Sequence, residues 1–235
     1  MILKKWEDLP DNFKCDEVKK YYDYLSTKKA SLVLKRIFDI LVSLILLLIL
    51  SPVFLILAII IKCTSKGPVF YRQVRVTQYG EEFRIFKFRS MVQNADKIGS
   101  LVTVGNDARI TGIGKVIRKC RLDEISQLID VLRGTMTFVG VRPEVPKYVA
   151  SYTPEMMATL LLPAGITSMA SILYKDESEI LDNAEDADKT YIEKVLPEKM
   201  KYNLNSLLDF GFFDDIKIMF MTVAAVLGKN YDKDC

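Results

Sequence analysis

The sequence predicts an α+β protein that is mostly helical, with a membrane-anchoring helix ahead of a small cytosolic domain. Three observations predict this fold. One stretch of the chain is apolar without interruption, two strand-like segments flank a turn near Tyr79-Gly80, and apolar residues recur at helical spacing further along. The expected organisation is a leader over 1–34, an anchor over 35–64, a cytosolic domain over 65–228 and a tail over 229–235.

The apolar run over 37–61 is long enough to cross a bilayer. At about 1.5 Å per residue a straight helix would be about 37 Å long, beyond the ~30 Å hydrocarbon core. Two features argue for a re-entrant helix hairpin instead. Pro52, preceded by Ser51, lacks an N–H and should kink the helix. Basic residues on both flanks place both ends in the cytoplasm: Lys28, Lys29, Lys35 and Arg36, then Lys62, Lys66, Arg72 and Arg75. These facts alone favour neither topology.

One carboxylate, Asp39, lies near the start of the apolar run. Because a charge in lipid is costly, we expect Asp39 to reach the interface by snorkelling, or to pair with Arg36. The residues before the run are too many and too charged for a signal sequence, and no small-residue cleavage site follows. The segment is therefore predicted to be retained as an anchor.

Composition excludes several classes of function. The 235 residues include no histidine, which excludes Ser-His triads and histidine metal sites, so a metal would need oxygen ligands and would be Mg²⁺ or Mn²⁺. A net charge of +3 indicates no nucleic-acid partner, whereas a basic excess beside the apolar run favours anionic lipids. The cysteines show no CxxC spacing and are predicted to be free thiols in a reducing compartment: Cys15, Cys63, Cys120 and Cys235.

Other segments complete the expected fold. The leader is either an amphipathic element at the headgroup level or a loose solvated segment. Residues 69–91 predict a β-hairpin whose basic face meets either a ligand or the bilayer. Residues 189–208 predict a helix broken at Pro197, and 212–227 an amphipathic helix that packs on the core or at the membrane interface.

Adjacent carboxylates at Asp123 and Glu124 are the candidate chemical groups. Apolar residues at helical spacing and a C-capping Gly134 place this pair in the first turn of a helix. The helix dipole there stabilises negative charge and attracts phosphate. An aspartate can attack phosphorus, a neighbouring carboxylate can hold a metal, and Arg118 and Arg142 can clamp phosphates. In isolation, however, most Asp-Glu pairs in a first helical turn do no chemistry, because the dipole alone favours them there.

The order of motifs along the chain resembles the bacterial sugar transferase family. These motifs are the Ser-Pro pair in the apolar run, GPVFYRQ, FRIFKFRSM, RLDEISQLIDVLRGTMTFVGVRP and PAGIT, from about Lys35 to Val226. The family comprises monotopic phosphoglycosyl transferases that begin lipid-linked glycan assembly. The chain resembles the small members, without the extra N-terminal membrane helices of the longer ones. The family's anchor is re-entrant at a helix-breaking pair that Ser51-Pro52 matches, so the resemblance favours the monotopic topology.

The resemblance also implies a reaction. Asp123 would be the nucleophile that attacks the sugar-linked phosphate of a UDP-sugar and expels UMP, and Glu124 would assist at a Mg²⁺ site with Asp123. Undecaprenyl phosphate, or another polyprenyl phosphate, would then attack the aspartyl phosphosugar. Arg118 matches a family arginine near the phosphates. Arg142 matches the arginine of a Pro-Arg-Pro motif, although Val141 replaces its first proline.

Lys87 and Arg89 match a basic hairpin motif near a substrate phosphate. Lys175 stands where many members have an arginine, so we hypothesise that it alters the choice of UDP-sugar. The implied location is the inner membrane with the domain facing the cytoplasm, and the implied partners are UDP-sugar, polyprenyl phosphate and membrane lipids. Two alternatives remain: another nucleotide-sugar enzyme without a polyprenyl phosphate acceptor, and a membrane scaffold. The sugar, the glycan pathway and a homodimer stay open.

Overall fold

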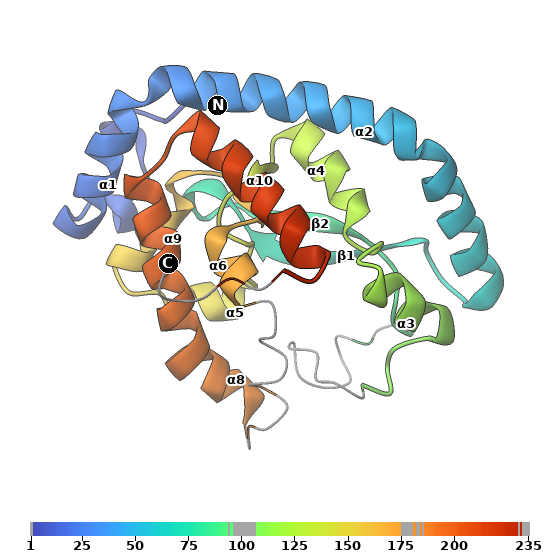
Figure 1. The fold of residues 1–235 in the computed structure, drawn as a ribbon. Helices are drawn as coiled ribbons and strands as arrows, with labels where there is room; N and C mark the ends of the chain where they lie inside the picture. The colour runs from blue at the N-terminus through green and yellow to red at the C-terminus, as the bar shows by residue number, and fades with distance from the viewer. Residues whose placement is uncertain are drawn as a thin grey trace.

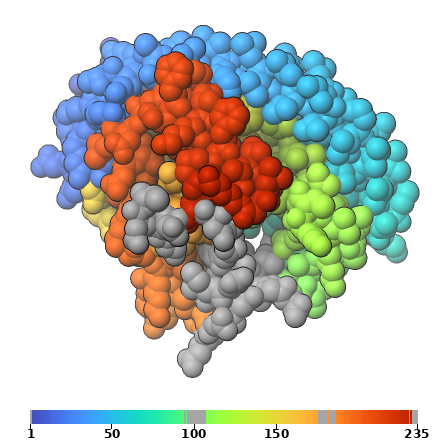
Figure 2. Space-filling model, viewed as in Figure 1, coloured from blue at the N-terminus to red at the C-terminus, as the bar shows by residue number. Residues whose placement is uncertain are grey.

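The computed structural model describes residues 2–93, 95, 107–174, 181, 184, 186–229 and 231. The described residues are mostly helical and include two small two-stranded sheets (Figure 1). The long helix α2 arches over the other elements, and α10 lies beneath the arch (Figures 1 and 2). The predicted α+β class with one long apolar helix is confirmed.

The elements have the following bounds. The helices are α1 Asp16–Thr27, α2 Lys29–Thr64, α3 Gly112–Lys119, α4 Leu128–Arg133, α5 Pro146–Val149, α6 Met169–Leu173, α8 Ala187–Thr190, α9 Leu196–Leu208 and α10 Phe212–Val226. The strands are β1 Phe70–Val76, β2 Glu82–Phe88, β3 Met136–Val139 and β4 Ala164–Thr167. Short 3₁₀ turns cover Trp6–Asp8, Asp11–Phe13, Gln78–Gly80, Ile125–Gln127 and Glu155–Leu161, and a π-helical turn covers Tyr191–Val195.

Helix α2 continues through Pro52 and bends in its second half (Figure 1). Pro52 has no N–H to donate to the carbonyl of Leu48. The Ser51 hydroxyl donates to that carbonyl instead, at 2.8 Å. The Ser-Pro pair therefore bends the helix without leaving this carbonyl unsatisfied. Within the described residues, α2 is the helix long and apolar enough to cross a membrane.

The expectation for Asp39 is wrong. Asp39 is 1% exposed, and its carboxylate accepts hydrogen bonds from the Thr137 hydroxyl at 2.7 Å and the Phe138 N–H at 3.3 Å. Arg36 does not pair with it in the structure; the guanidinium donates to the carbonyls at the end of α4. The apolar composition of α2 led us to expect that this face contacts lipid. In the structure the face is buried on the domain, where polar partners stabilise the charge of Asp39.

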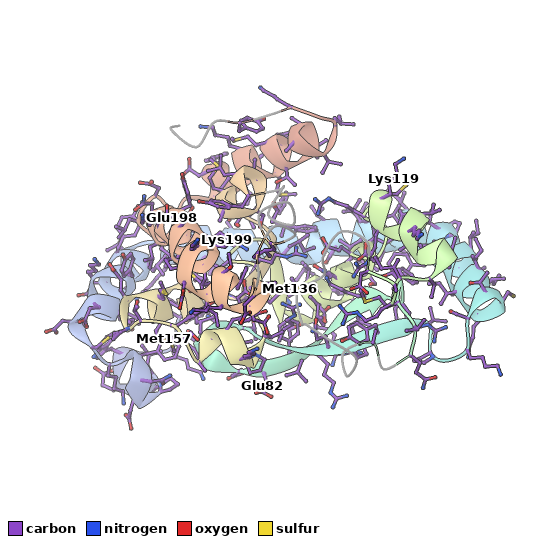
Figure 3. The ribbon with its side chains drawn as sticks, turned by 90° about the horizontal axis from the view of Figure 1, so that it is seen from below. Glu82, Lys119, Met136, Met157, Glu198 and Lys199 are labelled. Carbon is purple, nitrogen blue, oxygen red and sulfur yellow. The ribbon has the colours of Figure 1, made fainter. Side chains whose placement is uncertain are left out.

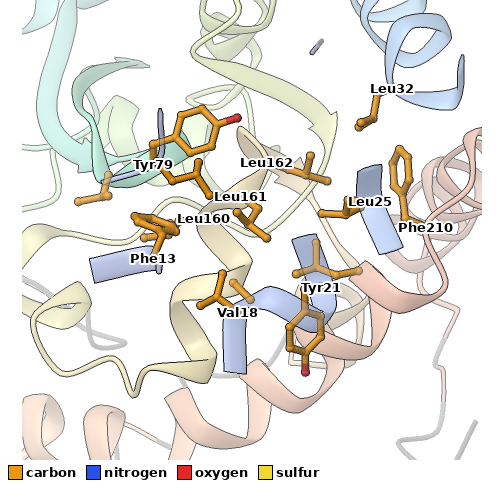
Figure 4. Packing of buried hydrophobic residues seen from close by; sticks show 14 residues of the cluster. Phe13, Val18, Tyr21, Leu25, Leu32, Tyr79, Leu160, Leu161, Leu162 and Phe210 are labelled. Atoms are coloured by element: carbon orange, nitrogen blue, oxygen red, sulfur yellow. The ribbon is translucent and has the colours of Figure 1, made fainter. Parts of the chain in front are cut away.

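The leader is structured, so the expectation of a loose solvated segment is wrong. Its apolar residues Phe13, Val18 and Leu25 are fully buried against Leu161 and neighbouring residues of the Glu155–Leu161 turn (Figure 4). In this cluster the leader contributes one wall of a hydrophobic core. The described cysteines, Cys15, Cys63 and Cys120, are free thiols.

The predicted hairpin is confirmed. Strands β1 and β2 pair antiparallel from Phe70 opposite Phe88 to Val76 opposite Glu82. The predicted helix break at Pro197 is confirmed: a π-helical turn over Tyr191–Val195 interrupts the α-helical hydrogen bonds, and α9 begins at Leu196 with Pro197 in its first turn, where a missing N–H costs no hydrogen bond.

A parallel pair, β3 and β4, was not predicted from the sequence. Met136 of β3 pairs with Ala164 of β4, and Figure 3 shows Met136 in the interior of the molecule. The chain segments that follow β3 and begin β4 approach so closely that a Cβ on Gly165 would lie 2.2 Å from the Gly140 nitrogen. Glycine is required at this contact.

Helix α10 has one face on the domain and one exposed face. Ile218 and Met219 pack with residues of α2 and β3, while Phe213 is 81% exposed. The other large exposed apolar residues of this region are Phe220, Val223, Val226 and Leu227. The amphipathic character expected of residues 212–227 is confirmed.

Candidate active site

Asp123 and Glu124 lie in a tight turn between α3 and the 3₁₀ turn that precedes α4, and not in a first helical turn as expected. Arg121 adopts a positive φ of 51°, which reverses the chain after α3. The carbonyl of Asp123 then accepts the Phe88 N–H of β2 at 3.0 Å. Because β2 occupies this edge, the helix starts later than its apolar periodicity predicts. The C-cap at Gly134 is confirmed by its φ of 89°.

Glu124 forms ion pairs with two basic residues from different elements. Its Oε1 accepts a hydrogen bond from Arg142 Nη2 and lies 3.3 Å from Lys87 Nζ. Burial alone would raise the pKa of Glu124, but Arg142 and Lys87 outweigh burial and hold that pKa well below its ordinary value. Glu124 is therefore an anion that joins β2 to the segment after β3.

Asp123 has a different electrostatic environment. Burial raises the pKa of its carboxyl; Lys87 opposes that rise, whereas the neighbouring Glu124 charge adds to it. Burial also lowers the pKa of Lys87, and Glu124 opposes that change. Lys87 thus interacts electrostatically with both carboxylates, and more strongly with Glu124, with which it forms an ion pair.

Asp123 opens onto a cavity of about 450 Å³ between the hairpin and α3. Arg118, from the last turn of α3, also lines it and is fixed by an Nε donation to Ser90 Oγ at 3.0 Å. The wall carries further basic and aromatic residues, namely Phe70, Tyr71, Arg72, Arg75, Lys87, Arg89 and Arg109. Several positive charges face one carboxylate here, which suits a ligand with several phosphate charges.

Glu124 opens onto a second cavity of about 510 Å³ between α2, α4 and α10. Its basic residues gather near Glu124: Lys119, Arg121 and Arg142. Figure 3 shows Lys119 at the outer end of α3. The remaining wall is mainly apolar, with Leu46, Leu50, Leu128, Phe138, Ile166, Ala225 and Val226. Adjacent carboxylates thus face two cavities of contrasting character.

The remaining predicted residues divide into three groups. Arg89 lines the Asp123 cavity, but its Nη2 donates to the Ser65 carbonyl and hydroxyl at 2.8 and 2.7 Å, at the end of α2. Ser51 and Pro52 lie in α2 and line neither the Asp123 cavity nor the Glu124 cavity. Lys175 lies outside the described residues. The sequence analysis missed Tyr71 and Arg109 as cavity residues; Tyr71 lies within the GPVFYRQ motif, which could have indicated it, whereas Arg109 lies in none of the motifs.

The carboxylate pair is the candidate holder of a magnesium ion. Among the described residues, no group of three or more acidic or cysteine side chains is placed to hold a metal. Mg²⁺ is commonly held by one or two carboxylates together with substrate phosphates. Asp123, in the arginine-rich cavity, fits that share of the ligands beside a diphosphate, whereas Glu124 could join it only by exchanging an ion pair with Lys87 or Arg142 for the metal.

Comparison with known proteins gives the family. The model of the family described as "Bacterial sugar transferase" matches residues 30–229. The chain belongs to the bacterial sugar transferase family. The chain is 36% identical over 197 residues to the UDP-N-acetylgalactosamine-undecaprenyl-phosphate N-acetylgalactosaminephosphotransferase of Aeromonas hydrophila, covering 83% of this chain and 44% of that protein.

Two further relatives show the range of this family. The UDP-glucose:undecaprenyl-phosphate glucose-1-phosphate transferase of Klebsiella pneumoniae is 35% identical over 199 residues, covering 82% of this chain and 40% of that protein. The uncharacterized sugar transferase EpsL of Bacillus subtilis (strain 168) is 31% identical over 196 residues, covering 83% of this chain and 88% of that protein. The chain spans less than half the length of the Aeromonas and Klebsiella relatives.

Proposed function

We propose that this chain is a phosphoglycosyl transferase that moves a sugar-1-phosphate from a UDP-sugar to polyprenyl phosphate. The observation that carries the proposal is that Asp123 and Glu124 are adjacent yet open onto different cavities. The cavity at Asp123 is rich in arginine and suits a nucleoside diphosphate. The cavity at Glu124 is apolar with basic residues near the carboxylate, and suits a lipid that ends in phosphate. The names of the Aeromonas and Klebsiella relatives each contain a UDP-sugar and undecaprenyl phosphate, which belong to these two substrate classes.

The proposed reaction has two displacements at one phosphorus. The Asp123 carboxylate oxygen attacks the phosphorus that bears the sugar, and the bond from that phosphorus to the UMP oxygen breaks. A phosphate oxygen of the polyprenyl phosphate then attacks the same phosphorus and frees Asp123. The products are UMP and a polyprenyl diphosphosugar.

The surrounding residues have separate roles in this proposal. Lys87 and Arg118 attract the diphosphate and favour the ionised nucleophile. Arg142 is held by Glu124 near the second cavity, where it would meet the acceptor phosphate. A Mg²⁺ ion held by Asp123, Glu124 and the diphosphate would neutralise negative charge. Because the pair Asp123–Glu124 has the smaller share of ligands, we expect magnesium affinity to rise in the presence of the donor.

We further propose that α2 is re-entrant and lies in one leaflet of the inner membrane, with the domain in the cytoplasm. Both halves of α2 pack on the same domain: Phe38 and Leu46 against the β3 cluster, and Leu57 and Ile61 against Phe88. A spanning helix would carry one of these halves across the bilayer. Basic residues at both ends of α2 also favour one side. The face away from the domain is exposed and apolar, as lipid contact requires.

The test is UMP release by the detergent-solubilised protein with Mg²⁺, undecaprenyl phosphate and a panel of UDP-sugars. Asp123→Asn should abolish turnover, while the matched control Asp130→Asn, a buried carboxylate outside both cavities, should retain it. Without acceptor, the wild-type protein should carry one covalent phosphosugar on Asp123, detectable by mass. Release of more than one UMP per protein molecule without polyprenyl phosphate would indicate a hydrolase or another glycosyltransferase. No release with any donor would favour the scaffold.

The role of Lys175 in choosing the sugar stays a proposal. It is motivated by the residue type alone, since lysine gives charge without the two-point hydrogen bonding of arginine. Lys175→Arg should change the ranking of UDP-sugars in the same assay. An unchanged ranking would contradict this role without affecting the proposed reaction.

A further inference from the structure

One turn of α2 holds the end of α4. Arg36 donates through Nη1 to the Val131 carbonyl at 2.6 Å and through Nη2 to the Leu132 carbonyl at 2.9 Å. These carbonyls belong to the last turn of α4, where a cation is favoured. A Cβ on Gly134 would lie 3.0 Å from Arg36 Nη2, so the guanidinium fits closely over the turn after α4.

The same turn of α2 also holds β3. Asp39 accepts the Phe138 N–H at 3.3 Å and the Thr137 hydroxyl at 2.7 Å, and Lys35 donates to the Val139 carbonyl at 2.7 Å. These side chains bond backbone groups of a strand, as a neighbouring strand would. Lys35, Asp39 and Thr137 are all at least 97% buried. In this environment a lost partner leaves a buried polar group unsatisfied, so the contacts fix one register of β3.

The ends of the same chain segment meet at the candidate active site. Asp123 and Glu124 precede α4, Arg142 follows β3, and Glu124 and Arg142 pair. Figure 1 shows one end of α4 meeting the arch of α2. A slip of β3 by two residues would carry Arg142 about 7 Å along the strand. The position of Arg142 against Glu124 thus depends on what holds β3.

We propose that Lys35, Arg36 and Asp39, here called the anchor clasp, are positioning residues for the active site. The clasp residues do not line the cavity at Asp123, and they do not contact Asp123 or Glu124. They act on Arg142 through β3. Lys35 also pairs with Asp215 of α10, which ties the exposed apolar helix to the same point. The membrane helix is then part of the catalytic framework as well as a tether. This inference rests on the proposed function for its kinetic test only.

The test changes the hydroxyl that Asp39 accepts from. Thr137→Val keeps the shape of the side chain and leaves one Asp39 oxygen unpaired, whereas Thr137→Ser keeps the hydroxyl. We expect Thr137→Val to lower kcat for UMP release about tenfold, because small misplacements of a reacting group have effects of this size. The KM for UDP-sugar should change less than about twofold, since the donor cavity is not touched, and Thr137→Ser should retain most of kcat.

The matched control is Ser43→Ala. Ser43 is fully buried one turn further along the same face of α2, and its hydroxyl donates only to Ile40 of its own helix, at 3.2 Å. A loss of kcat in Ser43→Ala equal to that in Thr137→Val would overturn the proposal. A second background, Arg142→Lys, separates positioning from general damage. If the clasp acts through Arg142, adding Thr137→Val to the Arg142→Lys variant should lower kcat little further. A further tenfold loss of kcat in the double variant would overturn the proposal.

A measurement without turnover keeps the inference separate from the proposed function. The coupling between Glu124 and Arg142 can be measured by unfolding the two single variants and the double variant. The clasp predicts that this coupling falls by more than half in the Thr137→Val background and is unchanged in the Ser43→Ala background. An unchanged coupling in both backgrounds would overturn the clasp even if UMP release is observed. A reduced coupling would support it even if no donor is turned over.

Discussion

The pair between Glu124 and Arg142 should contribute measurably to stability. The two side chains are 16% and 34% exposed, so the pair lies between a surface ion pair, worth about 0–1 kcal/mol, and a buried one, where loss of a partner costs about 3–5 kcal/mol. We therefore expect a coupling of about 2 kcal/mol from the cycle of Glu124→Gln, Arg142→Gln and the double variant. Glu124→Gln alone also removes the partner of Lys87, so its melting temperature should fall by about 4–8 °C.

The pH dependence of this coupling has a definite sign. The folded pKa of Glu124 lies below its ordinary value of 4.5, so the stabilisation is complete above that pH and is lost as the pH falls below it. Urea unfolding in detergent at pH 8, 6 and 3.5 would measure it. A coupling below about 0.5 kcal/mol at pH 8, or one that persists unchanged at pH 3.5, would refute the reasoning, since neither is compatible with a partly buried ionised pair.

Two further predictions concern stability. Burial raises the pKa of Asp130 from its ordinary 3.8 to about 6, although its carboxylate accepts the Phe86 N–H. The free energy of unfolding should therefore fall as the pH rises from about 4 through 6, because the buried carboxyl loses its proton. Asp130→Asn should thus raise the free energy of unfolding at pH 8 by at most about 3 kcal/mol, and an equal gain at pH 4 would contradict this cause. Gly165→Ala should destabilise by about 3 kcal/mol, because its Cβ would meet Gly140 backbone atoms at 2.2 Å. Gly112→Ala, with open space around it, is the control and should change stability by less than about 1 kcal/mol, and similar melting of the two variants would exclude the clash.

The sequence predicted the elements whose signals are local. Alternation on both sides of Tyr79-Gly80 gave the hairpin, and Gly134 gave the end of α4, because turn and cap signals reside within a few residues. The LDE motif and Arg142 were identified as site residues, and the structure brings Glu124 and Arg142 into contact. The motifs therefore named both residues, but the contact between them was not predicted, and periodicity placed the helix start too early.

The features missed from the sequence depend on distant contacts. Strands β3 and β4 are four residues each and far apart in the chain, so no period distinguishes them from loop. The position of Asp39 was predicted wrongly because the apolar helix was assumed to face lipid on all sides. In the structure, Thr137 of the domain donates a hydrogen bond to Asp39. Arg109 could not be assigned because a charged side chain near a strand is usually solvated, and only the fold shows a cavity beside it.

Under the proposed function, the two faces of α2 would allow one protein to use a soluble donor and a lipid acceptor. Leu46 and Leu50 line the cavity at Glu124, while Leu48 and Ile49, on the intervening positions, are 67% and 65% exposed on the outer face. The same turns of helix therefore supply both a cavity wall and the surface offered to lipid. Under the proposed function, an acceptor chain would pass from bilayer to Glu124 along apolar surface throughout. Its phosphate would leave the headgroup plane only where Arg121 and Arg142 replace the lost hydration.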